Sequence, residues 1–345
     1  MTKHWYQNKT KAINSAAIED ALARQAALTK PAGSLGRLEE IGVKFSGWQG
    51  TETPSLDKIQ IAVFAADHGI AEAGVSAFPQ QVTVEMVKNF ARGGAAISVL
   101  ARQCGARFCI VNMGTAFPCG ESESLISKPV AAGTHNFAKR SAMSAAQLDQ
   151  ALLSGAETVL ADSQVFIGGE MGIANTTSAA ALGCAYLGVK AGQLTGRGTG
   201  IDDAVLRHKT ELIDNALTLH KAAATTAFEK LCCFGGFEIA ALAGAYIACA
   251  QKGVPVLVDG FISTAAAVAA VSLNSGVRDW MLFSHHSQES GHRHLLSFLD
   301  ASPLLDFQMR LGEGSGAALC VCLLQSACLL QSEMATFEEA AVRTS

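Results

Sequence analysis

The chain has 345 residues, of which 49% are hydrophobic and 16% are charged. This composition can bury a large core, so it disfavours a disordered or fibrous protein. The 26 basic and 30 acidic residues leave a formal charge of -4 without a long run of either sign. Nucleic-acid binding through a basic face is therefore disfavoured, and we expect no nucleic-acid partner.

The two ends of the chain predict helices and no strand. Ile13–Leu28 and Arg37–Trp48 are predicted helices, and the tail after Gly316 predicts one or two more. We expect residues 1–50 and 316–345 to form a small helical domain and residues 51–315 to form a large α/β catalytic domain. With only 7 prolines in the chain, no obvious linker separates independent domains.

The middle of the chain alternates predicted strands with predicted helices. The strands are continuously apolar, which is typical of parallel strands that are covered on both faces. They are Ile59–Ala65, Phe108–Val111, Val165–Ile167, Val254–Val258 and Trp280–Phe283, and the Ala-rich helical segments include Val82–Gln103, Asn175–Leu187 and Ile262–Leu273. This order predicts a doubly wound, mostly parallel α/β sheet with helices on both faces.

The cysteines and the apolar stretches indicate a cytoplasmic protein. The 10 cysteines form no C-x-x-C pair or Cys-His cluster at zinc spacing, so we expect most of them to be buried thiols. No apolar signal core follows the charged N-terminus. Gly260–Val277 and Gly314–Ser332 approach membrane-spanning length but are diluted by small and polar residues, so no membrane span is predicted.

The loop after the third predicted strand is rich in glycine and polar residues. It contains Gly168-Gly-Glu170, and Asn175, Thr176 and Thr177 then open a helix. Backbone amides and hydroxyls at such a helix start can bind phosphate. Ordinary capping of the helix by Asn and Thr is the alternative. Glu170 favours a functional site, because a carboxylate in this tight turn has no evident structural task.

A second glycine-rich segment is Arg310-Leu-Gly-Glu-Gly-Ser-Gly-Ala317. It superficially matches a dinucleotide fingerprint, but the preceding Leu304–Met309 is a poor strand and too little chain follows for a βαβ unit. Glu313 is a plausible general base between flexible glycines. Alternatively, it complements a helix dipole. Spacing alone does not decide between the two interpretations.

Two histidine-containing loops raise the possibility of a metal site. Asp67-His68 and His285-His286 follow predicted strands, but they lie far apart in the sequence and lack metal-ligand spacing. We therefore expect no metal and no other cofactor. The residues alone indicate an α/β enzyme for a phosphorylated small molecule, with Glu170 and Glu313 as acid/base candidates.

Five ordered motifs carry a family resemblance. They are residues 30–39 (KPAGSLGRLE), 66–69 (ADHG), 168–177 (GGEMGIANTT), 259–261 (DGF) and 310–316 (RLGEGSG). Together they resemble the nicotinate-nucleotide:dimethylbenzimidazole phosphoribosyltransferases of cobalamin lower-ligand assembly. The resemblance implies a homodimer with a Rossmann-like large domain and a small helical domain built from both termini.

The resemblance also implies an activity. Such enzymes move phosphoribose from nicotinate mononucleotide to a benzimidazole nitrogen, which yields α-ribazole 5′-phosphate and nicotinate. By resemblance, Glu313 is the proton acceptor and Glu170 is a second acid near the ribose. The positions that match the nucleotide and phosphate site are Gly172, Asn175, Thr176, Gly198, Lys209, Gly260 and Ser287, and those that match the base pocket are Phe78, Pro79, Met86, Met171 and Leu311.

One residue departs from the expected pattern. Glu85 stands where a neutral residue, often Gln, is expected, and a carboxylate there could repel substrate or raise the pKa of a neighbouring group. This leaves the base preference open. The alternatives are a paralogue that uses adenine or a phenolic acceptor, and a silent ligand-binding subunit of the same fold. The presence of Glu313 and Glu170 speaks against the silent subunit.

Overall fold

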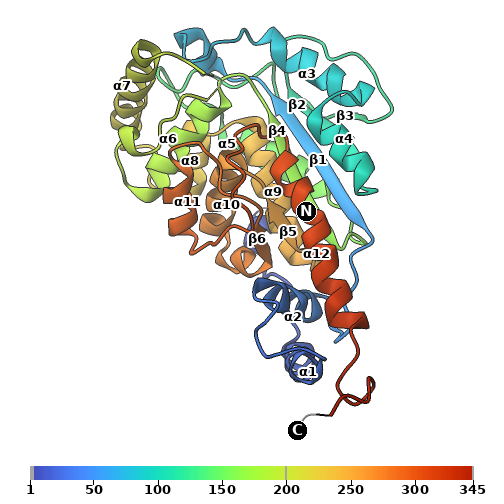
Figure 1. The fold of residues 1–345 in the computed structure, drawn as a ribbon. Coiled ribbons are helices and arrows are strands. Elements are labelled where there is room, and N and C mark those ends of the chain that lie inside the picture. The colour runs from blue at the N-terminus through green and yellow to red at the C-terminus, as the bar shows by residue number, and fades with distance from the viewer. Residues whose placement is uncertain (1–3, 199, 344–345) are drawn as a thin grey trace.

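Six parallel strands form one sheet in the order β3-β2-β1-β4-β5-β6 (Figure 1). The structure is a computed structural model that describes residues 4–198 and 200–343. The strands are β1 (Ile59–Ala66), β2 (Arg107–Gly114), β3 (Leu125–Ser127), β4 (Val165–Met171), β5 (Val256–Val258) and β6 (Met281–Phe283). All five predicted strands are present, and the predicted α/β class is confirmed. The short edge strand β3 was not predicted because it is half-exposed to exposed and carries no apolar run.

Twelve α-helices lie within the described residues. They are α1 (Ser15–Ala27), α2 (Arg37–Gln49), α3 (Gln81–Arg92), α4 (Ala96–Gln103), α5 (Ala145–Thr158), α6 (Asn175–Leu187), α7 (Asp203–Leu219), α8 (Ala227–Phe234), α9 (Phe237–Lys252), α10 (Phe261–Leu273), α11 (His292–Phe298) and α12 (Ser315–Glu333). The helical segment predicted over Val82–Gln103 consists of two helices, because the chain turns at Gly93, whose φ is 80°, and separates α3 from α4.

The two faces of the sheet are covered by different helices. The helices α3, α4 and α12 pack on one face, and α9 packs on the other with α5 and α10 beside it. Every residue of α9 from Phe237 to Ala250 is buried. The sequence therefore lacks the polar stripe that marks an amphipathic helix, and α9 was not predicted.

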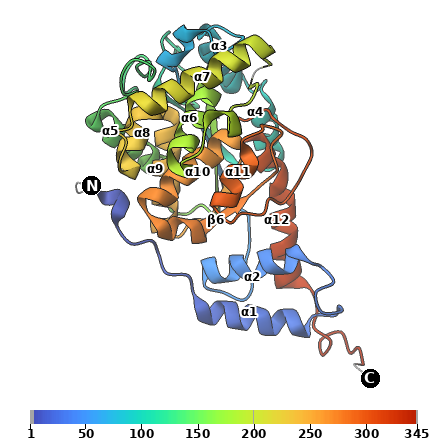
Figure 2. The same ribbon diagram turned by 90° about the vertical axis from the view of Figure 1, so that its left-hand side faces the viewer.

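The helices near the two termini lie together below the sheet (Figure 2). Both α1 and α2 pack against α12, where Gln25 Nε2 donates to Gln331 Oε1 at 2.6 Å and Arg24 Nε donates to the Gln331 carbonyl at 2.7 Å. The first described residues lie elsewhere, because Gln251 of α9 donates to the Trp5 carbonyl at 3.0 Å. The helical unit thus begins after this segment.

Helix α12 connects the sheet to the terminal helices. It packs against β4 and α4 as well as α2. Of the described helices, it alone is long and apolar enough to cross a membrane by length and composition, and 56% of its most apolar window is buried inside the protein. Such burial is typical of a helix in a protein core.

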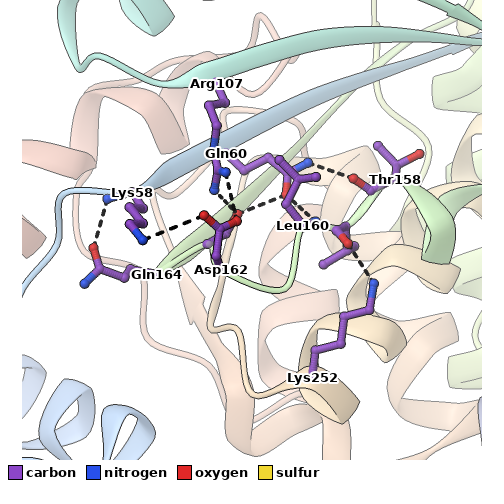
Figure 3. Close-up of polar contacts among 10 residues, drawn as sticks. Lys58, Gln60, Arg107, Thr158, Leu160, Asp162, Gln164 and Lys252 are labelled. Carbon is purple, nitrogen blue, oxygen red and sulfur yellow. Dashed lines mark hydrogen bonds and ion pairs between the residues drawn. The ribbon is translucent and has the colours of Figure 1, made fainter.

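Polar contacts join the amino ends of β1, β2 and β4 (Figure 3). Asp162 lies between Arg107, whose Nη1 is 2.8 Å from Oδ1, and Lys58, whose Nζ is 3.8 Å from Oδ2. Gln60 donates to the Thr158 carbonyl at 2.8 Å and accepts from the Leu160 amide at 2.9 Å. These contacts satisfy polar groups at the end of the sheet opposite the glycine-rich loops.

The strand order reverses between β1 and β4, which marks the topological switch point of the sheet. These strands are neighbours, with Phe64 paired to Glu170, although β2 and β3 extend the sheet to one side and β5 and β6 to the other. In an open α/β sheet, ligands bind at the carboxyl ends of the strands beside this switch point.

Candidate active site

A cavity of about 590 Å³ opens at the carboxyl ends of the strands. This volume is within the range of small-molecule sites. Its walls are Phe78, Val82, Met86, Glu170, Met171, Gly172, Ile173, Asn175, Thr176, Gly198, Gly260, Phe261, Ile262, His285, Ser287, Glu289, Met309, Arg310, Leu311, Gly312 and Glu313. Both glycine-rich segments therefore contribute to one site.

Glu170 is the second-last residue of β4. It lines the cavity, and its side chain is buried. Asn175 Nδ2 donates to Glu170 Oε2. Burial raises the pKa of Glu170 well above its ordinary value, and the nearby Asp259 and Glu238 carboxylates raise it further. The site thus favours the neutral acid at this position.

Glu313 faces the same cavity from the start of α12. Its φ is 65°, and its side chain is buried. Its Oε2 has no hydrogen-bond partner among the described residues. Burial is the main cause that raises the pKa of Glu313 to about 7, with a smaller contribution from Asp259. A carboxylate with this pKa can accept a proton near neutral pH.

The two glutamates line the same cavity because the backbone of β4 packs directly against the backbone at the start of α12. A Cβ atom at Gly169 would lie 2.0 Å from the Glu313 carbonyl oxygen. Any side chain at this position would therefore push the α12 loop away from β4. The glycine that precedes Glu170 brings the second glutamate into the same site.

The start of α6 differs from the ordinary capped helix that was the alternative interpretation. Its N-cap is Ala174, with a φ of 74° and no side-chain cap. Asn175 instead donates to Glu170, and Thr176 Oγ1 accepts from Lys209 Nζ at 2.9 Å. The side chains of Asn175 and Thr176 therefore bind other residues at the cavity and do not cap the helix.

Lys209 lies behind the cavity wall on α7. It is 1% exposed, and its Nζ also donates to the Gly196 carbonyl at 3.2 Å. Burial lowers the pKa of Lys209 to about 8, against a small opposing effect of Glu289. A lone lysine in a helix is usually solvated, so this burial was not evident from the sequence.

Twelve of the fourteen residues named from the sequence line the cavity, and Lys209 and Pro79 do not. Glu85 is exposed on α3 and does not line the cavity either, although its neighbour Met86 does. Within this chain, the Glu85 carboxylate therefore does not face the base pocket that it was expected to perturb.

Sequence reasoning missed several cavity residues, among them His285, Glu289 and Arg310. Arg310 opens the second glycine-rich motif, and its Nη1 donates to the Gly198 carbonyl at 3.2 Å. His285 lies two residues after the end of β6, so its position after a strand was the available signal. Glu289 carries no comparable signal in the sequence.

The acids and histidines that suggested a metal site make protein contacts. Asp67 accepts from Thr83 Oγ1 at 2.7 Å and from the Ala116 amide at 2.8 Å. His68 Nε2 lies 2.6 Å from Glu238 Oε1. Within residues 4–198 and 200–343, no group of three or more His, Cys, Asp or Glu side chains could hold a metal ion.

This fold and cavity define an α/β enzyme with two buried carboxyl groups at the switch point of a Rossmann-like sheet. A family model described as phosphoribosyltransferase matches residues 10–342. The chain belongs to this phosphoribosyltransferase family.

Curated relatives and a solved structure agree with this assignment. The chain is 53% identical to the nicotinate-nucleotide–dimethylbenzimidazole phosphoribosyltransferase of Pseudomonas putida over 99% of both chains. It is 56% identical to the enzyme of the same name from Xanthomonas oryzae over 93% of both chains. The crystal structure of such an enzyme from Thermus thermophilus superposes with a TM-score of 0.90 at 37% identity, and the match covers 96% of this chain and 100% of that one.

Proposed function

We propose that this phosphoribosyltransferase transfers the phosphoribosyl group of nicotinate mononucleotide to 5,6-dimethylbenzimidazole. The products are α-ribazole 5′-phosphate and nicotinate, and the reaction belongs to nucleotide-loop assembly of cobalamin. The enzyme names of relatives that are more than half identical over nearly the whole chain support this choice of substrates.

The observation that carries the proposal is the state of Glu313. Its Oε2 has no hydrogen-bond partner among the described side chains, and the carboxyl group faces the cavity with a pKa of about 7. A benzimidazole has one N–H proton, which must leave when the other ring nitrogen forms a new bond. A carboxylate with a free oxygen can take this proton.

The reaction then balances in one displacement. The unprotonated benzimidazole nitrogen attacks ribose C1, and the bond between C1 and the pyridinium nitrogen of nicotinate breaks. The electron pair of that bond returns to the ring nitrogen and neutralises its positive charge. The N–H proton of the benzimidazole passes to the Glu313 carboxylate, and water removes it in a later step.

Glu170 and the start of α6 are proposed to hold the ribose and the phosphate. Neutral Glu170 can donate a hydrogen bond to a ribose hydroxyl as well as accept one. Thr176 and Gly198 line the cavity near Lys209, whose positive charge favours an anion at this end. Asn175, Gly172, Gly260 and Ser287 complete the proposed nucleotide site.

The acceptor base is proposed to bind at the apolar end of the cavity. Phe78, Met86, Met171 and Leu311 line the cavity there, and Phe78 and Leu311 are 51% and 57% exposed. A flat aromatic base that covers these side chains would remove their apolar surface from water. Pro79 is proposed to fix the backbone beside Phe78.

We propose that the reaction needs no metal ion. Phosphoribosyl transfers that release pyrophosphate must stabilise a growing negative charge, for which magnesium is well suited. In the reaction proposed here, bond breaking discharges the positive charge of a pyridinium ring. The leaving group is therefore already activated, and orientation of the acceptor together with proton removal suffices.

Three further properties are part of the proposal. The small helical domain comprises α1 and α2 from the first 50 residues together with residues 316–345, residues 51–315 form the catalytic domain, and α12 is shared by both. The protein is a homodimer, for which exposed Val99 on α4 and Leu319 on α12 offer apolar contact surface. It acts in the cytoplasm, where its 10 cysteines, all free thiols, stay reduced.

The test is the kinetics of Glu313→Gln with Glu72→Gln as the control. Glu72 is exposed and pairs with Lys139. Glu313→Gln is expected to lower kcat about 10²–10⁴-fold, the usual effect of losing a general base. Calorimetry is expected to show unchanged binding of nicotinate mononucleotide. Full turnover by Glu313→Gln would exclude Glu313 as the base.

A further inference from the structure

Helix α12, which begins directly after the Glu313 turn, has no side-chain N-cap among its own residues. The N-cap of α12 is Gly314, which has no side chain that could accept a hydrogen bond. The first four amides of a helix have no partner inside the helix. At a buried helix start, these amides require acceptors from elsewhere in the protein.

Asp259 supplies two of these acceptors from the end of β5. Its Oδ2 accepts from the Gly314 amide at 3.2 Å, and its Oδ1 accepts from the Ala317 amide at 2.9 Å. The Asp259 side chain is 1% exposed and does not line the cavity. A carboxylate remote in sequence thus takes the place of the missing N-cap side chain.

We propose that Asp259 is the positioning residue for Glu313. By accepting from the backbone amides that follow Glu313, Asp259 holds the base in its left-handed backbone conformation at the cavity wall. This inference rests on the proposed function of Glu313 as the base. It assigns Asp259 no contact with substrate.

The backbone of Glu313 explains why such a device is needed. A φ of 65° is unfavourable for a residue with a side chain, and it persists only where the surroundings fix it. On the N-terminal side, the start of α12 packs closely on β4, where a Cβ atom at Gly169 would lie 2.0 Å from the Glu313 carbonyl oxygen. On the C-terminal side, Asp259 accepts from the amides of residues 314 and 317. The hydrogen bonds to Asp259 therefore fix the strained turn.

The ionisable groups around Glu313 define the pH behaviour. Asp259 and Glu170 face it from β5 and β4, Glu238 faces Glu170 from α9, and His285 Nδ1 lies 3.8 Å from Asp259 Oδ1. The Asp259 carboxylate raises the pKa of Glu313. Removal of this negative charge therefore lowers the pKa of the base, and the base stays ionised at lower pH.

The variant that tests the proposal is Asp259→Asn, which keeps the shape of the side chain and one of its two acceptor oxygens. The remaining amide nitrogen cannot accept from a backbone N–H, so the turn around Glu313 loosens. We expect kcat to fall about 10–100-fold, the usual effect of a small misplacement of a reacting group. We expect the KM for nicotinate mononucleotide to stay within about twofold. We also expect the acid limb of the kcat–pH profile to move to lower pH.

Ser144→Ala is the matched control for a lost helix cap. Ser144 caps α5 in a capping box and does not line the cavity. Its removal is expected to lower the thermal unfolding midpoint without change in kcat or in the pH profile. Glu313→Gln, measured alongside, separates the two ideas. If Glu313→Gln is inactive but Asp259→Asn retains full kcat, only the positioning inference fails.

Hydrogen exchange of the parent protein tests the same contacts without any substitution. The amides of Gly314 and Ala317 are expected to exchange as slowly as those of the second turn of α12, although they lie at the helix start. Exchange at the rate of unprotected amides would overturn the proposal. An Asp259→Asn variant with parental kcat, or with an unchanged acid limb, would also overturn it.

Discussion

Replacement of Glu313 by glutamine is expected to stabilise the protein while it abolishes most turnover. Glu313 is buried, and its pKa is raised from 4.5 to about 7. Between these values, the folded state binds more protons than the unfolded state, so the parent protein loses stability as the pH rises. Glutamine has nearly the same shape and no charge, so the variant does not lose stability in this way.

The magnitude follows from the two pKa values. At about 1.4 kcal/mol for each pH unit, the change from 4.5 to about 7 corresponds to on the order of 3 kcal/mol. The advantage of Glu313→Gln should be close to zero below pH 4.5, grow between pH 4.5 and about 7, and stay constant above that. Below pH 4.5 the parent carboxyl group is protonated in both states.

Urea unfolding of the parent and of Glu313→Gln at several pH values from 4 to 9 measures this difference. Glu72→Gln is the control, because the pKa of Glu72 is lowered by Lys139 and its removal offers no stability gain at high pH. A Glu313→Gln variant no more stable than the parent at pH 8 would refute the reasoning. A gain that does not depend on pH would refute it as well.

Three further predictions concern other parts of the site. A Cβ atom at Gly172 would lie 2.4 Å from the Ala66 carbonyl oxygen. Gly172→Val should therefore raise the KM for nicotinate mononucleotide at least tenfold, and an unchanged KM in folded protein would contradict this. The KM of the parent should also rise as the pH passes about 8, where Lys209 loses its charge, and Lys209→Met should abolish this rise. Glu85→Gln should leave the ratio of kcat/KM for dimethylbenzimidazole and adenine within about twofold, because Glu85 is exposed; a larger change would place Glu85 in the base site.

The strands and the site loops could be predicted because their signals are local. Continuous apolar runs marked the five longer or more buried strands. Two glycine-rich segments, one at the end of β4 and one before α12, carry Glu170 and Glu313. That these two glutamates share one cavity was implied by the family resemblance and not by any local signal in the sequence. That contact depends on the packing of α12 against β4, and the two segments lie far apart in the chain.

The other features that were not predicted also depend on contacts between distant parts of the chain or on complete burial. Helix α9 is buried on all sides, so its sequence has no periodic polar face. The burial of Lys209 depends on Thr176 and the Gly196 carbonyl, which belong to other segments. Asp259 lies in a recognisable motif, but its role depends on amides contributed by a distant helix. The break between α3 and α4 falls at adjacent glycines and could have been predicted.

Product analysis in a competition between acceptor bases shows whether the protein transfers phosphoribose to 5,6-dimethylbenzimidazole. The purified protein is incubated with nicotinate mononucleotide and equal concentrations of 5,6-dimethylbenzimidazole, adenine and phenol, with a chelator present. Mass spectrometry and proton NMR identify the products and the configuration at ribose C1. We expect α-ribazole 5′-phosphate as the main product, with one nicotinate released for each molecule formed. A main product that contains adenine or phenol, nicotinate release without an acceptor, or activity that requires added metal would contradict the proposed function.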